Sequence, residues 1–237
     1  MKISNSLKLY IADTSCLDDP VLFDKCLGMV SECRRSKVGS YRFRKDRNLA
    51  LGAGLLLQIG LAARGIGEKD AAYAFGPNGK PFLQERPEIR FNLSHSGTMA
   101  AAAFADCEVG CDIEEVTELE DDVAAMFLRS GEFENVRSIT DNDARRQLLF
   151  RYWTIKESVQ KATGLGAALP MDSFEIVLEN GLQPIVKNLA SDRWHIVEVD
   201  ICRSYKCAIC TDGPVGKVDV SEIDFTSPDF AMHIAEY

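Results

Sequence analysis

The segment GCDIEEV, residues 110–116, places two carboxylates two residues apart in a short, mostly apolar stretch. On a β-strand successive side chains alternate between faces, so Asp112 and Glu114 would point to one side and Ile113 to the other. Two neighbouring carboxylates repel each other unless a cation lies between them or one of them is protonated. The pattern indicates either a strand end in solvent or part of a cation site, which needs oxygen ligands from a second segment.

A second segment, FRYWTIKESVQKATGLG at residues 150–166, is predicted to end a long helix. Trp153, Glu157 and Lys161 are four residues apart and therefore share one helix face. Alone, Glu157 and Lys161 would form a surface ion pair worth roughly 0.3 kcal/mol. Combined with Asp112 and Glu114, Glu157 would give one Mg²⁺ a third hard oxygen, and Lys161 would face a phosphate bound to that ion. The set favours metal-assisted attack on a phosphoryl group.

Other polar groups suit a phosphate ligand. Ser94, His95 and Ser96 are expected in a polar bend, where two hydroxyls and an imidazole would meet phosphate oxygens, and Lys80 in GKP adds a cation. The segment 33–47 gathers seven cations against Asp46, namely Arg34, Arg35, Lys37, Arg42, Arg44, Lys45 and Arg47. In an acidic protein such a basic segment is either a solvated helix face or a binding surface for phosphates or an acidic partner.

The composition indicates an ordinary soluble globular protein. The chain has 237 residues, of which 46% are hydrophobic and 27% charged. Its net charge of −9 argues against a general nucleic-acid binder, which would have a basic face. The N-terminus shows no secretory signal, and the apolar run 49–63 is too short to span a bilayer and is predicted to form a buried helix. We expect a cytoplasmic protein without membrane contact.

The eight cysteines are expected to be reduced thiols. Cys207 and Cys210 form a C-x-x-C pattern, but they fall in a predicted buried strand, and no second pair or nearby histidine completes a zinc site. Buried cysteines usually behave as small hydrophobic residues. We therefore assign these two residues, and Cys111 in the GCDIE segment, to packing.

Hydrophobic patterns and turn residues predict a mixed order of helices and strands. In the first half we expect a strand at 7–12, helices at 20–34 and 41–64, a strand at 89–94, and a hairpin that joins 99–105 to 110–116. In the second half we expect helices at 120–129, 130–139 and 141–163, capped by Thr140 or Asp141 and followed by Gly164. Strands are expected at 173–178, 183–187, 194–201 and 205–211, with a hairpin turn at Asn180–Gly181.

Three of these segments resemble the motifs of one family. FNLSHSG (91–97), GCDIE (110–114) and WTIKESVQKATGLG (153–166) are similar to the three motifs of the 4′-phosphopantetheinyl transferases. The chain length, the strands of the second half and LPMDSF (169–174) resemble the larger, pseudodimeric type that activates surfactin synthetase. The resemblance spans about residues 41–187. The combination of W-T-x-K-E-x-x-x-K with G-x-D-I-E is specific to this family.

The resemblance implies an α+β fold of two similar α/β lobes related by a pseudo-twofold axis, with the active site between them. Residues 1–115 would form the N-terminal lobe and bind coenzyme A. Residues 116–237 would complete the magnesium site and the cleft for the carrier protein. The protein would be a monomer.

The resemblance also implies an activity. Such enzymes transfer 4′-phosphopantetheine from coenzyme A to a serine of an acyl or peptidyl carrier protein and release adenosine 3′,5′-bisphosphate. By match, Asp112, Glu114 and Glu157 would bind Mg²⁺, with Mn²⁺ as an alternative ion. Glu157 would also accept the serine proton, directly or through water, and Lys161 would neutralise charge on the transferred phosphoryl group.

The remaining matched residues would bind the co-substrate. Ser94, His95, Lys80 and Lys161 resemble residues that bind the phosphates of coenzyme A, and His95 is also assigned to the catalytic group. Asn48 occupies a position where the family commonly has an arginine, so Arg47 or Arg44 would have to compensate.

The basic segment 33–47 would dock the carrier protein, because carrier proteins are typically acidic, or it would help to bind the 3′-phosphate of coenzyme A. Glu132 matches a glutamate of the family's second half, and we assign it no chemistry. The alternative is a non-catalytic relative that only binds coenzyme A or a carrier protein, and the change at Asn48 keeps it open. Another magnesium-dependent phosphotransferase is a weaker alternative, because the sequence has no P-loop.

Overall fold

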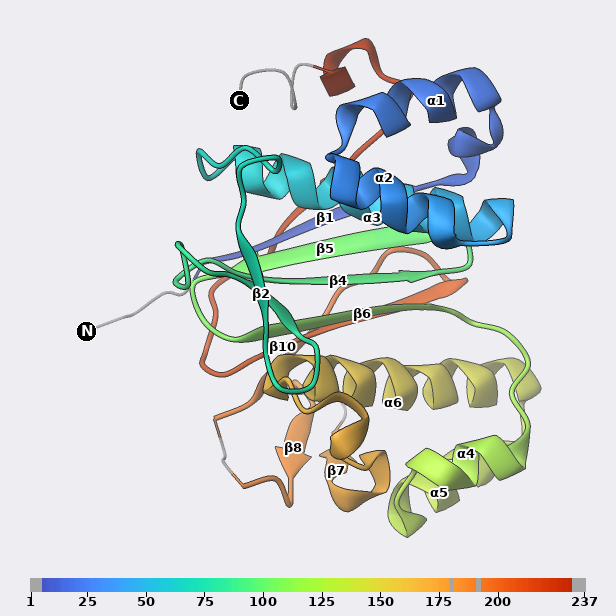
Figure 1. The fold of residues 1–237 in the computed structure, drawn as a ribbon. Coiled ribbons are helices and arrows are strands. Elements are labelled where there is room, and N and C mark those ends of the chain that lie inside the picture. The colour runs from blue at the N-terminus through green and yellow to red at the C-terminus, as the bar shows by residue number, and fades with distance from the viewer. Residues whose placement is uncertain (1–5, 180, 191–192, 232–237) are drawn as a thin grey trace.

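The computed structural model describes residues 6–179, 181–190 and 193–231, which form alternating layers of helix and sheet (Figure 1). Three helices cover a four-stranded sheet, and a long helix lies against a second, three-stranded sheet. The expectation of a mixed α and β fold is confirmed. The first half contains β1 (Leu7–Asp13), α1 (Pro20–Met29), α2 (Glu32–Ser40), α3 (Arg44–Ala62), β2 (Tyr73–Phe75), β3 (Pro81–Leu83), β4 (Arg90–Ser96), β5 (Met99–Ala105) and β6 (Val109–Glu115).

The second half contains three helices and the remaining strands. These are α4 (Asp121–Phe127), α5 (Ser130–Arg137), α6 (Asn142–Thr163), β7 (Glu175–Val177), β8 (Ile185–Lys187), β9 (His195–Glu198), β10 (Tyr205–Thr211) and β11 (Asp219–Glu222). Short 3₁₀ turns occur in the first half at Ser15–Asp18 and in the second half at Gly166–Ala168, Met171–Ser173 and Pro228–Ala231. The four-stranded sheet has the order β11-β1-β5-β4, the three-stranded sheet β6-β10-β9, and β2-β3 and β7-β8 are separate hairpins.

Helix α6 begins and ends where its sequence predicts. The Asp141 side chain accepts a hydrogen bond from Ala144 N at 2.7 Å, which caps the first turn. Gly164 ends the helix in the left-handed conformation at φ 69°, which glycine adopts without steric cost. The region expected to form one helix at 20–34 is instead two, because Val30 is extended and Ser31 caps a new helix by accepting from Arg34 N at 3.3 Å.

The predicted hairpin of 99–105 with 110–116 is wrong. Strand β5 pairs with β1 on one edge and with β4 on the other, so neither edge is left for β6. Strand β6 pairs instead with β10 in the other sheet. The turn at 106–108 therefore carries the chain from one sheet to the other. The sequence analysis also missed β11, a mostly exposed edge strand whose polar sequence DVSE lacks the usual strand pattern.

The polar bend expected at Ser94–Gly97 begins later than predicted. Residues 94–96 belong to β4, and the reversal into β5 is made by Gly97 and Thr98. Gly97 has φ +62°, and a Cβ there would lie 2.1 Å from the hydroxyl oxygen of Tyr205. In the second half, β7 and β8 do form an antiparallel hairpin. Of its predicted turn, Asn180 lies outside the described residues, whereas Gly181 has φ +77°.

Three clusters of buried apolar side chains separate the layers. One lies between α1–α3 and the four-stranded sheet, and includes Leu51, Leu55 and Phe104. A second packs α6 against β10, α4 and α5. The third fills the space between the two sheets, with side chains from β1, β5, β6 and β10. The two sheets are thereby held face to face.

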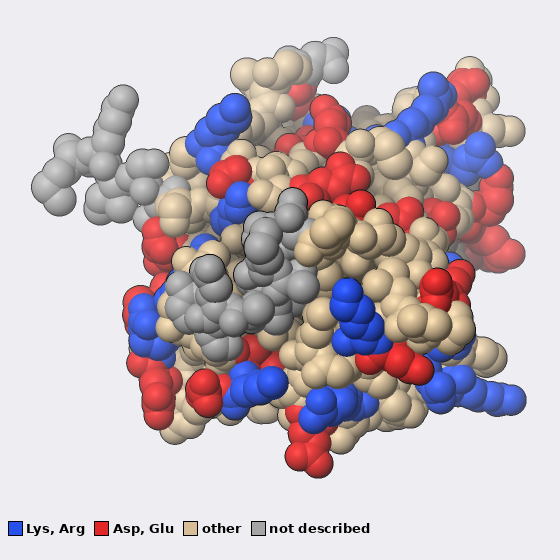
Figure 2. All heavy atoms as spheres, turned by 90° about the horizontal axis from the view of Figure 1, so that it is seen from above, with Lys and Arg blue, Asp and Glu red and all other residues tan. Residues whose placement is uncertain are grey.

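Surface charge, the cysteines and the apolar run 49–63 can each be compared with what the sequence predicts. Lys and Arg are interspersed with Asp and Glu on the face seen from above (Figure 2), so neither sign dominates it. All eight cysteines are free, and Cys111, Cys207 and Cys210 are buried. The apolar run 49–63 lies almost entirely in the buried helix α3. Of the helices in the described ranges, α3 included, none has the length and apolarity that a membrane crossing requires.

Candidate active site

A pocket of about 280 Å³ lies where α2, α3, β4, β6 and α6 meet. It collects three acidic side chains on one side and cations from two helices. The lining residues are Arg34, Lys37, Tyr41, Ala50, Ala53, Leu93, Ser94, His95, Asp112, Glu114, Glu157 and Lys161. The pocket thus brings together all three proposed metal ligands with Ser94, His95 and Lys161.

A glycine allows the strand and helix of this pocket to approach closely. Strand β6 carries Asp112 and Glu114 to the same side, and helix α6 carries Glu157 and Lys161. A Cβ at Gly110 would lie 2.1 Å from the carbonyl oxygen of Ser158 and 2.2 Å from the amide nitrogen of Ala162. Only glycine fits between the two backbones, which explains the first letter of GCDIE.

Asp112 is the most deeply buried acid of the pocket, at 1% exposed. Its Oδ1 accepts hydrogen bonds from Lys161 Nζ at 2.6 Å and from Ser94 Oγ at 2.8 Å. Its Oδ2 is a buried atom that has no hydrogen-bond partner among the described residues. Leaving a buried carboxylate oxygen unsatisfied is costly, so this oxygen points to a missing cation.

Glu114 accepts a hydrogen bond from Ser96 Oγ at 2.6 Å, and Trp153 also hydrogen-bonds to it. Burial, followed by the negative charge of Asp112, raises the pKa of Glu114 to about 7. The positive charge of Lys161 opposes this rise in the pKa of Glu114 but does not outweigh burial and Asp112. A divalent cation beside Asp112 and Glu114 would favour the ionised form of both carboxylates.

The carboxylate of Glu157, within α6, forms no hydrogen bond with any residue that the structure describes. Burial and the charge of Asp112 raise its pKa, although Lys161 opposes the shift. For Lys161, burial disfavours the charged form, but Asp112 and Glu157 outweigh it and raise the pKa of the ammonium group. Three carboxylates therefore share one close ammonium group, which leaves an excess of negative charge.

The donor set fits a magnesium ion. No group of three His, Cys, Asp or Glu side chains converges in the geometry of a metal centre among the described residues. Lys161 lies against Asp112 instead and partly neutralises it. The unsatisfied Oδ2 of Asp112 and the uncompensated charge of Glu114 and Glu157 are nevertheless what a hard cation with oxygen ligands would stabilise.

A larger cavity, of about 630 Å³, lies between α6 and the β9–β10 connection. Its charged side chains are already paired. Arg151 binds both carboxylate oxygens of Glu198 at 2.7 Å, and Arg203 pairs with Asp143. Because its main charges are satisfied locally, this cavity is a weaker candidate for an anionic substrate than the smaller, acid-rich pocket.

The comparisons with known proteins agree with the motifs. Residues 108–210 match the family model of the 4′-phosphopantetheinyl transferase superfamily. A 4′-phosphopantetheinyl transferase of Bacillus subtilis is 29% identical over 194 residues, which cover 81% of this chain and 86% of the relative. The transferase Sfp of Bacillus subtilis strain 168 is 24% identical over 204 residues, covering 85% and 91%. The transferase gsp of Aneurinibacillus migulanus is 32% identical over 151 residues, covering 61% and 62%.

The chain is thus similar to 4′-phosphopantetheinyl transferases over most of its length, and its residues 108–210 match the model of their superfamily. Among solved structures, a holo-(acyl-carrier-protein) synthase from Bacillus anthracis in complex with coenzyme A (3′,5′-ADP) is 18% identical, with a TM-score of 0.38, over 44% of this chain and 93% of that one.

Two of the expected phosphate-binding residues, Ser94 and His95, reach the pocket in different ways. The Ser94 hydroxyl is buried and donates to Asp112, so it serves the acidic cluster first. His95 points from β4 toward the pocket and stays accessible. Partial burial, and then the charges of Lys161 and Lys37, lower the pKa of His95. A neutral imidazole suits hydrogen bonding to a phosphate rather than ion pairing.

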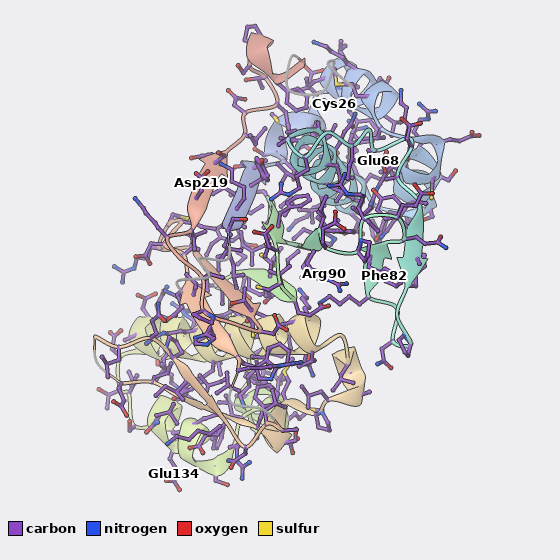
Figure 3. All side chains as sticks on the ribbon, turned by 90° about the vertical axis from the view of Figure 1, so that its left-hand side faces the viewer. Cys26, Glu68, Phe82, Arg90, Glu134 and Asp219 are labelled. Atoms are coloured by element: carbon purple, nitrogen blue, oxygen red, sulfur yellow. The ribbon has the colours of Figure 1, made fainter. Side chains whose placement is uncertain are left out.

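Lys80 lies outside the lining of this pocket. Its Nζ donates to Glu108 at 2.8 Å and to the carbonyl oxygen of Ala162 at 2.9 Å, near the end of α6. It lines a smaller cavity of about 200 Å³ beneath the β2–β3 hairpin, whose lining also includes Phe82 and Arg90, both labelled in Figure 3. Its assignment to coenzyme A stays a prediction and would require Lys80 to leave these partners.

Arg47 and Arg44 also lie outside the lining. Arg47 donates to the Tyr41 carbonyl at 2.8 Å. Arg44 donates to Asn48 at 3.1 Å and to the Leu17 carbonyl at 2.8 Å, and it stacks over Phe23. Asn48 is buried and faces this contact rather than the pocket. Asn48 donates to Asp18 at 2.7 Å and so joins α3 to the 3₁₀ turn Ser15–Asp18.

The sequence analysis did not single out the cations that do line the pocket. Arg34 and Lys37, three residues apart on α2, line the same pocket as the three acids. Arg34 is held by Glu68, labelled in Figure 3, with 3.7 Å between Nε and Oε1. Burial and the nearby Arg34 lower the pKa of Lys37. Their i,i+3 spacing would place both side chains on one face of a helix. The predicted helix ended at residue 34, however, so Lys37 was not expected on the same helix as Arg34.

Proposed function

We propose that this protein transfers 4′-phosphopantetheine from coenzyme A to a serine of an acyl or peptidyl carrier protein and releases adenosine 3′,5′-bisphosphate. One observation carries the proposal: three carboxylates and Lys161 share a pocket that Arg34 and Lys37 also line. Polyanions such as coenzyme A require cations at several points, and a metal requires clustered oxygens. The similarity to 4′-phosphopantetheinyl transferases supports the same reaction.

Asp112, Glu114 and Glu157 are the residues that would hold Mg²⁺, or Mn²⁺ in its place. When bound, the ion neutralises charge on the pyrophosphate of coenzyme A. The Oδ2 of Asp112, which is buried and unsatisfied, supports this assignment. Ser94 and Ser96 hold the two strand carboxylates in place by donating to them.

The residues of the chain perform the other tasks. The serine hydroxyl of the carrier protein is a poor nucleophile until its proton is removed. Glu157 accepts that proton, directly or through water, because its carboxylate lines the pocket and is free of hydrogen bonds to described residues. The serine oxygen then bonds to the phosphorus of the pantetheine phosphate, and the bond to the bisphosphate breaks.

Lys161 and the α2 cations stabilise the negative charges of the reaction. Lys161 lies between Asp112 and Glu157 and would face the transferred phosphoryl group. His95 would donate a hydrogen bond to a phosphate oxygen from the edge of β4. Arg34 and Lys37, two cations of the basic segment 33–47, would bind the anionic bisphosphate end of coenzyme A, whereas Arg47 and Lys80 lie outside the lining of the pocket.

The pseudo-twofold arrangement is part of the proposal. The N-terminal lobe, 1–115, would bind coenzyme A, and the lobe 116–237 would add Glu157 and Lys161 and part of the cleft for the carrier protein. Contacts between β6 of one lobe and α6 of the other support an active site at their junction. We further propose a cytoplasmic monomer whose acidic partner docks near the basic segment 33–47.

The proposal is tested by intact mass spectrometry of an apo carrier protein incubated with this protein, coenzyme A and Mg²⁺. A gain of one phosphopantetheine that EDTA prevents and that Asp112→Ala loses is the expected result. Several carrier types, from fatty acid, polyketide and peptide synthesis, are included. No gain on any of them, with coenzyme A still bound, would overturn the proposal and favour the non-catalytic alternative.

A further inference from the structure

Strands β4 and β6 lie side by side but belong to different sheets, so the backbone ladder does not join them. Side chains of β4 take the place of a neighbouring strand. Asn92 Oδ1 accepts from Cys111 N at 2.8 Å, Ser94 Oγ from Ile113 N at 3.3 Å, and Ser96 Oγ from Glu115 N at 3.2 Å. Alternate side chains of one strand thus satisfy alternate amides of the other.

Ser94 and Ser96, but not Asn92, also donate a hydrogen bond to a carboxylate of β6. Ser94 Oγ donates to Asp112 at 2.8 Å, and Ser96 Oγ donates to Glu114 Oε2 at 2.6 Å. A serine hydroxyl has one proton and two acceptor sites. Since the amide of Glu115 takes one acceptor site of Ser96, the hydroxyl proton is directed to the carboxylate. A bond to an ionised acceptor at this distance is among the stronger hydrogen bonds.

We propose that Ser96 is a positioning residue for the metal-binding carboxylate of Glu114. It holds Oε2, and with Trp153 from α6 it fixes the orientation of the carboxylate toward the shared pocket. Groups that hydrogen-bond to a metal ligand orient it and are often as important to affinity as the ligand itself. The inference rests on the proposed function, because Glu114 is a ligand only in that proposal.

A purely structural role for Ser96 is the competing explanation. In that case Ser96 would only join β4 to β6, and its loss would lower stability without affecting metal binding. Asn92 supplies a matched control, since it makes the same kind of bond to β6 through Cys111 N but has no carboxylate partner in the pocket. Asn92 does not line the pocket, and it is buried, so its removal should cost at least as much stability.

The test measures Mn²⁺ binding to the full-length protein by electron paramagnetic resonance, with coenzyme A present. Four proteins are compared: the parent, Ser96→Ala, Ser96→Thr and Asn92→Ala. We expect Ser96→Ala to weaken Mn²⁺ binding by about 10- to 100-fold. Ser96→Thr keeps the hydroxyl and should bind Mn²⁺ within a few-fold of the parent. Asn92→Ala should keep parental affinity while its melting temperature falls. If Asn92→Ala is too unstable to purify, the contrast between Ala and Thr at position 96 still decides the matter.

A kinetic measurement adds a second readout. In Ser96→Ala the Mg²⁺ concentration for half-maximal transfer should rise by a similar factor, while kcat at saturating Mg²⁺ changes much less. Parental Mn²⁺ affinity in Ser96→Ala, with a parent that binds Mn²⁺ and transfers phosphopantetheine, would overturn the role of Ser96 alone. A parent that neither binds Mn²⁺ nor performs the transfer would overturn the proposed function and this inference together.

Discussion

Helix α6 carries two lysine–carboxylate pairs whose lysines are five residues apart, and the two pairs have opposite surroundings. Lys156 pairs with Glu132 at 2.8 Å, and both side chains are almost fully buried. Lys161 pairs with Asp112 at 2.6 Å in the pocket, where the lysine is 27% exposed. The chemistry of the two pairs is the same, so the difference between them lies in what else each group contacts.

The Lys156 pair is complete. Lysine has three donors, and those of Lys156 meet Glu132 and the carbonyl oxygens of Met171 and Phe174 at 2.8 and 2.9 Å. Glu132 in turn accepts from the amides of Arg129 and Ile176. Burial lowers the pKa of Lys156, although Glu132 opposes this shift. The position that matches the family's second-half glutamate therefore has a structural role here.

The Lys161 pair is incomplete. Asp112 keeps an unsatisfied buried oxygen, and Glu114 and Glu157 add charge that Lys161 alone does not balance. In contrast to Lys156, the pKa of Lys161 is raised, because Asp112 and Glu157 outweigh burial. The comparison teaches that the satisfaction of a buried ion pair, more than its presence, distinguishes a structural pair from a ligand site.

The largest effect expected is on stability, at the complete pair. Lys156→Met leaves Glu132 buried without its cation, which costs about 3–5 kcal/mol of unfolding free energy. Urea denaturation measures this loss. The double variant Lys156→Met, Glu132→Leu should recover part of it, because no buried charge then remains. Parental stability in Lys156→Met would show that the complete pair is not structural.

The next effect is on the rate, at the incomplete pair. Glu157→Gln removes the proposed base and a metal ligand, so kcat should fall by about 10²- to 10⁴-fold. The folded state does not stabilise the ionised carboxylate, since its pKa is raised, so stability should not fall. The intact mass of the carrier protein over time measures kcat, and urea denaturation measures the free energy of unfolding. Glu198→Gln, which alters a surface pair with Arg151, should keep parental turnover. Near-normal transfer by Glu157→Gln would refute the assignment.

Adding or removing metal should change the stability of the protein through the Lys161–Asp112 site and not through the Lys156–Glu132 pair. With coenzyme A present, Mg²⁺ at 100 times its Kd should stabilise the parent by about 2.7 kcal/mol, because it binds the folded state. EDTA should reverse the gain, and Asp112→Asn should largely abolish it. Differential scanning fluorimetry measures the shift in melting temperature. An equal Mg²⁺ effect in the parent and in Asp112→Asn would place the ion elsewhere.

The smallest effect expected is on carrier recognition. Charge reversal at Arg42 and Lys45, exposed residues of the basic segment, should raise KM for the carrier protein several-fold and reduce its salt dependence. Arg44 is left unchanged because it joins α3 to the Leu17 carbonyl and to Asn48. Reversal at Lys25 and Lys187 controls for net charge. If salt does not alter KM in the parent, the basic segment is not the docking surface.

Much of the secondary structure could be predicted locally. The caps at Asp141 and Gly164 bound α6, and the apolar run 49–63 lies in α3. The pairing of β6 could not be predicted, because an apolar strand fits beside several partners and its true neighbour, β10, lies about ninety residues later. Likewise β11 carries little apolar signal, because it is an exposed edge strand.

The sequence by itself determined which residues were available for chemistry: the D-x-E pattern on a strand, and Glu157 and Lys161 one turn apart on a helix. These spacings follow from the fixed periods of the two elements. Only the tertiary structure decided which lysine of α6 is satisfied, that Arg34 and Lys37 rather than Arg47 or Lys80 line the pocket, and that Ser96 contacts Glu114. Those outcomes depend on contacts between distant segments, and burial of charge is settled by the groups that surround it in space.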